Sequence, residues 1–490
     1  MTESNPLETD RTPGLKRVVI ETLTRVEGHG KVTLLLDEDG HVRQARLHIV
    51  EFRGFEKFVQ GRPYWEVPVM VQRLCGICPV SHHLAASKAM DQVIGAKALT
   101  ATAEKVRRLM HYGQILQSHA LHFFHLSSPD LLFGFDSDVA RRNIVGIAAA
   151  HPELARRGVL LRKFGQEIIR VTAGKRIHGT GSVPGGVNRS VPLAERKALR
   201  AESGRMIEWC RDAVQLVRRL FEQNLAEYRD FGSFPSHSLC MVRGDGAMDL
   251  YDGGLRARLA DGSTLFDHAD YSTYWKHILE DVKPWSYMKF PFLLALGAED
   301  GWYRVGPLTR VTGCDFIPSP LAEQERREFL AFDDGSAARA TLGFHWARMI
   351  EMLHAAEVIE ALLEDEDVSG DDLMARGERQ RRGVGVIEAP RGTLIHHYRV
   401  DERDQVVRAN LVVSTTHNNE PMNRAIRSVA RRYLDGRTLT EGLLNHIEVA
   451  VRAFDPCLSC ATHALGKMPL AVELRDADGA LLHSLRSGRV

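Results

Sequence analysis

The sequence predicts a mainly helical α+β fold, in which a core bundle of long helices is surrounded by β hairpins and small sheets. Several long segments carry apolar residues at helical spacing, and shorter alternating runs flank turn sequences. Neither an internal repeat nor a low-complexity linker is visible along the chain. We therefore expect one large domain with no clean internal boundary.

The helical pattern is most regular in four segments. In the second of them, Met206, Cys210 and Val217 belong to one apolar stripe, so Cys210 is expected in the core. Pro129 suits the first turn of a new helix after the first segment, and Pro456 cannot continue the last helix. The pattern predicts helices over residues 102–126, 192–228, 337–363 and 440–454.

Strands are predicted where alternating runs flank short polar turns. Runs 32–36 and 42–50 flank the turn 37–40, and runs 393–400 and 405–413 flank the turn 401–404. The segment 470–482 is expected to form another hairpin, around residues 476–479. The charged stretch 364–382 is expected to be a solvated loop.

Composition narrows the class of protein. The chain has 490 residues, 44% of them hydrophobic and 26% charged, with a net charge of +1. Such a balance gives no indication of nucleic acid or of an anionic membrane as a partner. No apolar run approaches the ~20 residues that span a bilayer, and residues 1–13 lack the basic and apolar regions of a secretion signal. We expect a cytoplasmic protein without a membrane span.

The seven cysteines are the most informative feature, because four of them form two CxxC pairs near opposite ends of the chain. The pairs are Cys75 with Cys78 and Cys457 with Cys460, and together they could present four thiolates to one soft metal centre. A structural zinc site is the simplest alternative, but zinc ribbons usually hold their pairs much closer in sequence. A thioredoxin-like redox site would need only one pair.

The residues around these pairs resemble a known family. The segment RLCGICPVSH (residues 73–82) resembles the nickel–iron hydrogenase motif RxCGxCxxxH, and DPCLSCATH (residues 455–463) resembles DPCxxCxxH. Further resemblance lies in LTRVEGHG, FRGFE, PGGVN, EAPRG and VVSTTHNN, so that it covers residues 23–463. The chain is most similar to the large, catalytic subunits of the soluble NAD-reducing bidirectional group. The resemblance implies a domain over 1–463 and a C-terminal extension, 464–490, that is removed on maturation.

The resemblance also implies roles for individual residues. Nickel would be held by Cys75, Cys78, Cys457 and Cys460, with Cys78 and Cys460 bridging to an iron that carries cyanide and carbon monoxide. Heterolytic cleavage of H2 leaves a proton, which Cys457 would accept and pass to the carboxylate of Glu27. A buried magnesium ion is implied near the metals.

The remaining implied residues surround the metals. The guanidinium of Arg391 would lie above them, where a fixed charge could polarise H2. Pro390 and Thr415 would line the pocket of the diatomic ligands, and His82 would contact a cysteine sulfur. The magnesium ligands would be Glu56 and His463. Ser118 departs from many membrane-bound relatives, which have an aspartate there, and this removes a carboxylate beside Arg391.

The chain offers no cysteines for an iron–sulfur cluster of its own and no dinucleotide fingerprint, so electrons must leave through other chains. The resemblance implies a small subunit with iron–sulfur clusters, a flavin-containing diaphorase that reduces NAD⁺ or NADP⁺, maturation proteins and a C-terminal endopeptidase. Three alternatives stay open: a zinc-binding structural or assembly protein, an H2-sensing homologue, and the related quinone-module subunit of respiratory complex I, which lacks these thiolates.

Overall fold

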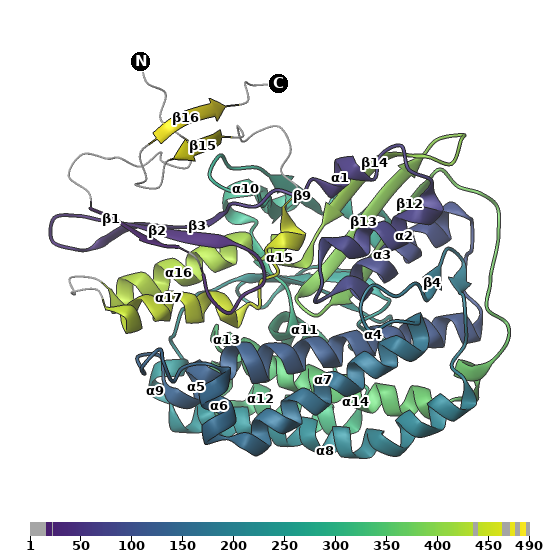
Figure 1. Cartoon of the computed structure of the whole chain (residues 1–490), viewed down its shortest axis with the longest axis horizontal. Helices are drawn as coiled ribbons and strands as arrows, with labels where there is room; N and C mark the ends of the chain where they lie inside the picture. The colour runs from purple at the N-terminus through teal and green to yellow at the C-terminus, as the bar shows by residue number, and fades with distance from the viewer. Residues whose placement is uncertain (1–15, 22, 435–439, 463–470, 476–480, 487–490) are drawn as a thin grey trace.

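Four long helices form the base of the molecule in this computed structural model, which describes residues 16–21, 23–434, 440–462, 471–475 and 481–486. They are α4 (Ala101–Leu121), α7 (Pro152–Ala173), α8 (Leu193–Gln223) and α14 (Gly343–Glu364). In Figure 1 they lie side by side in the lower half, where α4 packs against α7 and α14, and α8 packs against α14. The predicted mainly helical fold is confirmed.

Burial of the side chains differs among these helices. The α8 helix buries a single stripe that includes Met206, Cys210 and Val217, while its other face is exposed. The α14 helix is buried on almost every side. Its Trp346 ring lies against Phe221 of α8 and Phe329 of α12 (Pro320–Ala331), with ring centroids 5.4 and 5.2 Å apart. The helical layer therefore encloses a large apolar core.

In Figure 1, the labelled strands of the small sheets lie above this layer. Two three-stranded antiparallel sheets matter most for the site: β1 (Lys16–Ile20), β2 (Gly30–Leu36) and β3 (Val42–Ile49), and β12 (Arg382–Ala389), β13 (Gly392–Val400) and β14 (Val406–Val412). A four-stranded sheet has the order β11-β6-β7-β8, from Tyr303–Arg304, His237–Val242, Gly254–Arg258 and Thr264–Ala269. Two-stranded pairs are β4 and β5 (Ser182–Val183, Gly186–Val187), β9 and β10 (Ile278–Asp281, Phe290–Leu293), and β15 and β16 (Ala471–Arg475, Leu481–Arg486).

Shorter helices connect the layers. The longer of them are α3 (Pro79–Val93), α12 (Pro320–Ala331), α16 (Asn419–Tyr433) and α17 (Glu441–Ala453). The others are α1 (Phe55–Phe58), α2 (Val67–Met70), α5 (Ser128–Phe133), α6 (Ile144–Ala150), α9 (Leu225–Tyr228), α10 (Gly297–Asp300), α11 (Pro307–Gly313), α13 (Ser336–Arg339) and α15 (Ser414–His417). No helix among the described residues is long and apolar enough to cross a membrane.

The α3 helix lies directly on the β12–β13–β14 sheet because two glycines leave room for it. A Cβ at Gly385 would come within 2.0 Å of the Ala85 carbonyl oxygen, and one at Gly383 within 1.8 Å of the Ala89 carbonyl oxygen. Glycine is the residue that permits so close an approach of two backbones. This contact fixes the N-terminus of α3, where Cys78 lies, against the sheet.

Several predicted boundaries need correction. The predicted helix 192–228 is broken at Asn224, and the predicted helix 337–363 is broken by the extended backbone of Ala340 (φ −69°, ψ 143°). The first long helix ends as a π-helical turn, His122–Ser127, before α5 begins with Pro129 in its first turn. The α7 helix was not predicted, and β12 starts at Arg382, the last residue of the expected loop.

The predicted hairpins are confirmed in their positions. The first is formed by β2 and β3, the second by β13 and β14, and the last by β15 and β16. The turn of the last hairpin, residues 476–480, lies outside the described residues.

Candidate metal centre

All four predicted cysteine ligands meet at one buried point. The Sγ atoms of Cys75, Cys78, Cys457 and Cys460 lie within 4.8 Å of one another. Cys457 Sγ is 3.2 Å from Cys75 Sγ and 2.9 Å from Cys460 Sγ, while Cys78 Sγ is 3.8 Å from Cys460 Sγ. All four are free thiols, not disulfides. Four sulfur atoms at these separations match the donor set of one soft metal centre.

Local structure presents the first pair from a turn and a helix end. Cys75 follows a short 3-10 turn, Val71–Leu74, and Cys78 is the residue before the first turn of α3. Pro79 occupies that first turn, where a missing N–H costs nothing. The backbone N–H groups of Ile77 and Cys78 point at Cys75 Sγ, at 3.2 and 3.4 Å. Such donors stabilise a thiolate at this position.

The second pair follows α17 in an irregular loop. Asp455 adopts a left-handed backbone conformation (φ 53°), which turns the chain after the helix. The backbone N–H of Cys457 then donates to the Thr415 hydroxyl at 2.9 Å. A short 3-10 turn, Ser459–Ala461, contains Cys460. The thiols therefore come from two segments that belong to opposite ends of the sequence.

Hydrogen bonds among the thiols and their burial shift the pKa values of the two cysteine pairs in opposite directions. Hydrogen bonds from Cys457 and Cys460 lower the pKa of Cys78 to about 6, and hydrogen bonds from the other three cysteines also lower the pKa of Cys75. Burial raises the pKa values of Cys457 and Cys460. Four thiolates in so small a volume repel one another, and a bound cation is the usual means of deprotonating all of them.

Glu27, which the sequence predicts to be a proton acceptor, lies against the second pair. Its carboxylate Oε2 accepts from Cys457 Sγ at 3.0 Å and from the Ser459 N–H at 3.1 Å. The backbone is fixed as well, because the Leu458 N–H donates to the Glu27 carbonyl at 3.0 Å. Glu27 and Cys457 thus form a parallel bridge between the N-terminal segment and the C-terminal loop.

Arg391 is buried in the tight turn between β12 and β13, beside the thiols. Its guanidinium donates to Asp455 at 3.0 Å and to the Ser118 hydroxyl at 3.3 Å, while its Nε has no partner among the described residues. Burial opposes its charge, but Asp455 and the nearby thiolates together raise its pKa. Asp455 therefore supplies the carboxylate that the serine at position 118 does not.

A very small cavity of about 10 Å³ adjoins the thiols. Arg391, Pro390, Thr415 and His82 line it, together with Cys78, Cys457, Cys460, Ser81, Ala389, Leu394, Val413 and Ser414. His82 Nδ1 is 3.1 Å from His396 Nε2, and no hydrogen bond in the described part of the chain joins it to a cysteine sulfur. The predicted lining residues are thus assembled around one apolar and positively charged space.

Glu56 lies in a separate buried polar cluster. Its Oε1 accepts from Lys289 Nζ at 3.0 Å and from the Leu411 N–H at 2.8 Å. The same ammonium contacts Glu280 and Asn410, and Glu280 Oε1 is buried without a partner among the described residues. His463, the second predicted magnesium ligand, lies outside the described residues. Its neighbour Thr462 accepts from the Gly54 N–H at 3.3 Å, two residues before Glu56.

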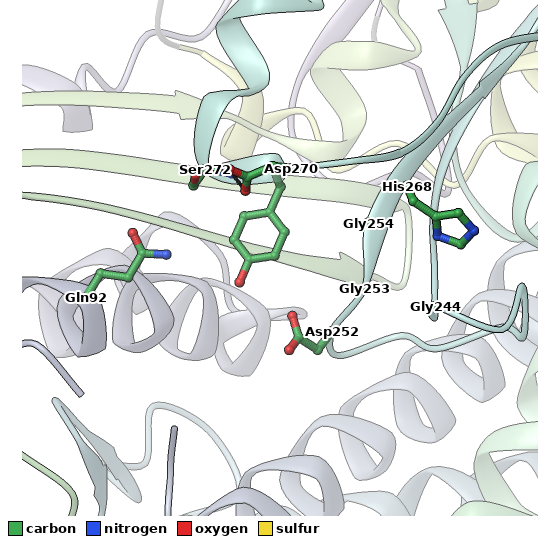
Figure 2. Close-up of a pocket in the computed structure, with 9 residues that line it drawn as sticks. Gln92, Gly244, Asp252, Gly253, Gly254, His268, Asp270 and Ser272 are labelled. Carbon is green, nitrogen blue, oxygen red and sulfur yellow. Dashed lines mark hydrogen bonds between the residues drawn. The ribbon is translucent and has the colours of Figure 1, made fainter. Parts of the chain in front are cut away.

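A wider depression of about 630 Å³ lies elsewhere (Figure 2). Its polar side chains already have partners: Gln92 pairs with the Val384 backbone, Asp252 with Lys88, and Asp270 with Ser272. An open depression with satisfied polar groups does not compete with the cysteine cluster as the chemical centre.

The chain belongs to the nickel-dependent hydrogenase family. The family model matches residues 53–135 and 259–463, and a HoxL-like model matches residues 17–52. Among curated proteins the chain is 49% identical over 482 residues to the NAD-reducing hydrogenase HoxS subunit beta of Cupriavidus necator, covering 95% of this chain and 99% of that protein. It is 41% identical over 474 residues to a chain of the F420-non-reducing hydrogenase of Methanothermobacter marburgensis, covering 95% and 99%.

Solved structures agree with this assignment. An NAD⁺-reducing nickel–iron hydrogenase in its H2-reduced state shares 60% sequence identity and superposes with a TM-score of 0.91, over 91% of this chain and 99% of that one. The nickel–iron–selenium hydrogenase of Desulfovibrio vulgaris Hildenborough, at 23% identity and a TM-score of 0.74 over 92% of this chain and 100% of that one, shares the fold. The four-cysteine cluster of this family member is therefore a site for nickel and iron, and the alternative of a zinc-binding structural or assembly protein is not supported.

Sequence reasoning missed the partners of the predicted residues. Asp455 was visible in the DPC motif but received no role, although it is the carboxylate that binds Arg391. Ser459 occupies a variable position of the DPCxxCxxH motif and Glu51 belongs to no motif, yet both continue the hydrogen bonding beyond Glu27. Contacts between distant segments give no signal in a single sequence.

Proposed function

We propose that the chain is the catalytic subunit of a nickel–iron hydrogenase that cleaves H2 reversibly and heterolytically, with NAD⁺ or NADP⁺ as the final electron acceptor of its complex. The observation that carries this proposal is the carboxylate of Glu27 at 3.0 Å from a thiol of the four-cysteine cluster. When bound, the metal centre would supply the Lewis-acid and redox chemistry. Cys75 and Cys457 would be terminal ligands of nickel, and Cys78 and Cys460 would bridge to iron.

Side chains of this protein would accept and transfer the proton that is released from H2. Cys457 Sγ takes it up and Glu27 receives it across the 3.0 Å hydrogen bond, which is within the reach that proton transfer requires. Arg391 places a fixed positive charge beside the thiols, held by Asp455, and a preorganised charge stabilises the separating charges of H2. Water is excluded because every thiol is buried.

Carbon monoxide and cyanide ligands of iron would occupy the small cavity. Leu394, Val413 and Ala389 make it largely apolar, which suits carbon monoxide. The Thr415 hydroxyl accepts from the Cys457 N–H, so its own proton is free to donate to a cyanide nitrogen. Pro390 would line the cavity beside Arg391. His82 would also line it, with its imidazole ring held in place by the hydrogen bond to His396.

Magnesium would bind at Glu56 and His463. Support comes from the oxygen atoms gathered there and from the orphaned Glu280 Oε1, since this cation prefers oxygen ligands. Lys289 already provides one positive charge in the cluster, so a bound ion would have to share Glu56 with the ammonium or displace it.

The partner with iron–sulfur clusters would dock on the exposed apolar side chains of the segment that precedes the first cysteine pair in the sequence. These are Val50, Phe52, Phe58, Trp65 and Val69, which are 37–53% exposed. Exposed apolar side chains that gather on a surface often mark a protein interface. A diaphorase unit would carry the electrons on to the nicotinamide cofactor, in keeping with the relative named for NAD reduction.

Maturation would convert the chain into its active form. We propose that residues 1–463 form the catalytic domain, that maturation proteins insert the metals in the cytoplasm, and that an endopeptidase removes residues 464–490. Mass spectrometry of the active complex would then give a chain that ends at His463. An active enzyme that retains the tail would contradict this part of the proposal.

Metal analysis and infrared spectroscopy of the purified complex test the function. We expect nickel in the complex, with iron in excess of nickel because the iron–sulfur clusters of the partner add to it, absorption bands of cyanide and carbon monoxide, and H2-dependent reduction of NAD⁺ or NADP⁺. The variant Cys457→Ser should lose nickel, whereas Cys210→Ala, which removes a buried thiol of the α8 core, should retain it. Zinc without these bands in material from a host with the maturation proteins would refute the proposal.

A further inference from the structure

Two buried side chains from other helices hold the C-terminus of α17. The last four carbonyl groups of a helix have no partner within it and need donors from elsewhere. His122 Nε2 lies 2.8 Å from the Arg452 carbonyl oxygen, and Arg348 Nη2 donates to the Ala453 carbonyl oxygen at 2.9 Å. The loop that carries Asp455 and the second cysteine pair begins directly after these carbonyl groups.

The π-helical turn after α4 brings His122 to this position. The turn, His122–Ser127, packs against α17. Its Ser127 hydroxyl, five residues after His122, lies 3.1 Å from the same Nε2 atom. The α7 helix leaves room for the turn at Gly158, where an added Cβ would lie 2.5 Å from Phe124 Cβ. Short π-helical turns are rare, and they occur frequently at functional sites.

Arg348 of α14 is a fully buried cation without an ion pair among the described residues. Burial lowers its pKa to about 10, although the nearby carboxylate of Asp455 favours its charge, so that it stays charged at neutral pH. Its Nη1 lies 3.4 Å from His345 Nδ1, and the His345 ring stacks on that of His122. The carbonyl end of a helix carries a partial negative charge, which a cation stabilises.

We propose that His122 and Arg348 are positioning residues of the nickel–iron centre, because they fix the point from which the loop with Asp455, Cys457 and Cys460 starts. This inference rests on the proposed function, since the reaction at these thiols is what the position of the loop controls. A displacement of ~1 Å at a reacting group can lower a rate by about 10²-fold.

Packing alone does not account for these two side chains. His122 Nδ1 and Arg348 Nε are buried without a partner among the described residues, and each such atom costs free energy that an apolar side chain would not. Burial also lowers the pKa of His122, which keeps its ring neutral. A carbonyl oxygen can only accept, so the single proton of this ring lies on Nε2 and points at Arg452.

Alkylation of the full chain without metals tests the capping independently of H2 turnover. In His122→Leu, which has a similar volume but no N–H, we expect iodoacetamide to modify Cys457 and Cys460 about 5–10-fold faster, because loss of one hydrogen bond raises the population of an opened loop. The buried thiol of Cys210 in the α8 core should react at an unchanged rate, since it reports opening of the whole fold. Mass spectrometry of the modified peptides measures all three rates.

Two matched variants separate the hydrogen bond from the loss of the ring. His122→Gln can place an amide N–H near the former Nε2 atom, and it should restore slow modification of the second cysteine pair. The control His354→Leu removes another fully buried histidine of the helical layer, which bonds the Ser319 hydroxyl, and it should change none of the rates.

In the loaded complex, His122→Leu should lower H2 turnover by about 10²-fold and shift the infrared bands of the iron ligands, with nickel content unchanged. His122→Gln should restore both. Arg348→Met keeps the inference testable if His122→Leu does not fold, because Arg348 leaves no ion-pair partner behind among the described residues. We expect this variant to speed modification of the second pair in the same way.

Unchanged modification of Cys457 and Cys460 in the variant that folds overturns the inference, and so does a parallel rise at Cys210, which would indicate a general loss of stability. If the unaltered complex contains no nickel and does not oxidise H2, the proposed function fails and the positioning role falls with it. The alkylation rates distinguish the two failures, because they are measured without metals.

Discussion

Arg391 depends on a single carboxylate in this protein. Asp455 accepts one hydrogen bond from the guanidinium at 3.0 Å, and Ser118 takes the place at 3.3 Å where many membrane-bound relatives have an aspartate. A guanidinium held by two different partners keeps a fixed orientation, which an ammonium on a flexible chain does not. The direction of the charge toward the metals is therefore set by Asp455 and Ser118 together.

Replacing Arg391 tests this role. We expect Arg391→Lys to lower H2 turnover by about 10²–10³-fold, similar to the loss of one preorganised donor in other enzymes. Nickel and iron content should not change, because no metal ligand is altered. The control Arg327→Lys changes an exposed arginine that pairs with Glu323, and should leave turnover unaltered. Normal turnover in Arg391→Lys would show that charge alone is sufficient.

A buried ion network connects the elements that carry this arginine. Arg310 of α11 donates to Glu351 of α14 at 2.6 Å, and to Glu388 at 2.8 Å and the Ala389 carbonyl at 3.0 Å, both in β12. His119 of α4 also binds Glu351, at 2.8 Å. Since all these side chains are buried, the turn after β12 is fixed to the helical layer by charge as well as by packing.

Removal of the Arg310 guanidinium should therefore lower the stability of the fold. Arg310→Met leaves two carboxylates buried without their cation, and we expect the free energy of unfolding to fall by about 3–5 kcal/mol. The exposed pair removed by Arg327→Met should cost only ~0–1 kcal/mol. Urea denaturation of both variants measures the difference. Equal stability of Arg310→Met and the unaltered protein would show that the network contributes nothing net.

Within this network, the contribution of Glu351 to stability depends on pH with a definite sign. Burial would raise the pKa of Glu351, but Arg310 and His119 together lower it from 4.5 to about 2. Its contribution to stability is thus complete above pH 4.5 and is lost as the pH falls toward 2. In Arg310→Met burial dominates, so that Glu351 holds its proton in the folded state. The variant should be less destabilised in mild acid than at neutral pH, which urea titrations at both pH values will detect.

The turn between β12 and β13 requires glycine at position 392. Its φ is +136°, and an added Cβ would lie 2.2 Å from Val305 Cγ2. Gly392→Ala should therefore displace Arg391 and cost more than the ~1–3 kcal/mol of a strained backbone conformation alone. Gly61→Ala is the matched control, because Gly61 also has positive φ (+77°) but no atom within 4 Å of the added Cβ. Equal losses of stability in the two variants would mean that the contact with Val305 adds nothing to the cost of the substitution.

Sequence reasoning succeeded for elements with their own local pattern and failed where distant residues decide. The β2–β3 hairpin and α17 were predicted because alternation, turn residues and a terminal proline are local signals. Asn224 and Ala340 break predicted helices, yet nothing in their immediate sequence forbids continuation. The site residues were found through motifs, and their partners Asp455 and Ser459 became visible only in three dimensions.

At the scale of the whole molecule, the site joins the two ends of the chain. Thr24 binds Glu448 of α17 through both its N–H (3.0 Å) and its hydroxyl (2.7 Å), and Arg452 donates to the Thr24 carbonyl at 3.0 Å. The first cysteine pair lies on α3 and the turn before it, while the second follows α17. Bringing such distant segments together carries a loop-closure cost, which contacts at the site must offset.

Metal binding should therefore stabilise the whole fold and not only the site. A metal that binds the native state alone adds about 2.7 kcal/mol at a free concentration of ~100 times its Kd, and four thiolates from two distant segments act as a cross-link. We expect the urea midpoint of the loaded complex to exceed that of the metal-free chain, with protease cleavage between α17 and Cys460 suppressed only in the loaded form. The variant Cys457→Ser should show neither effect. A loaded and a metal-free chain with the same midpoint would mean that packing alone assembles the four thiols, and that the metals enter a site already fully formed.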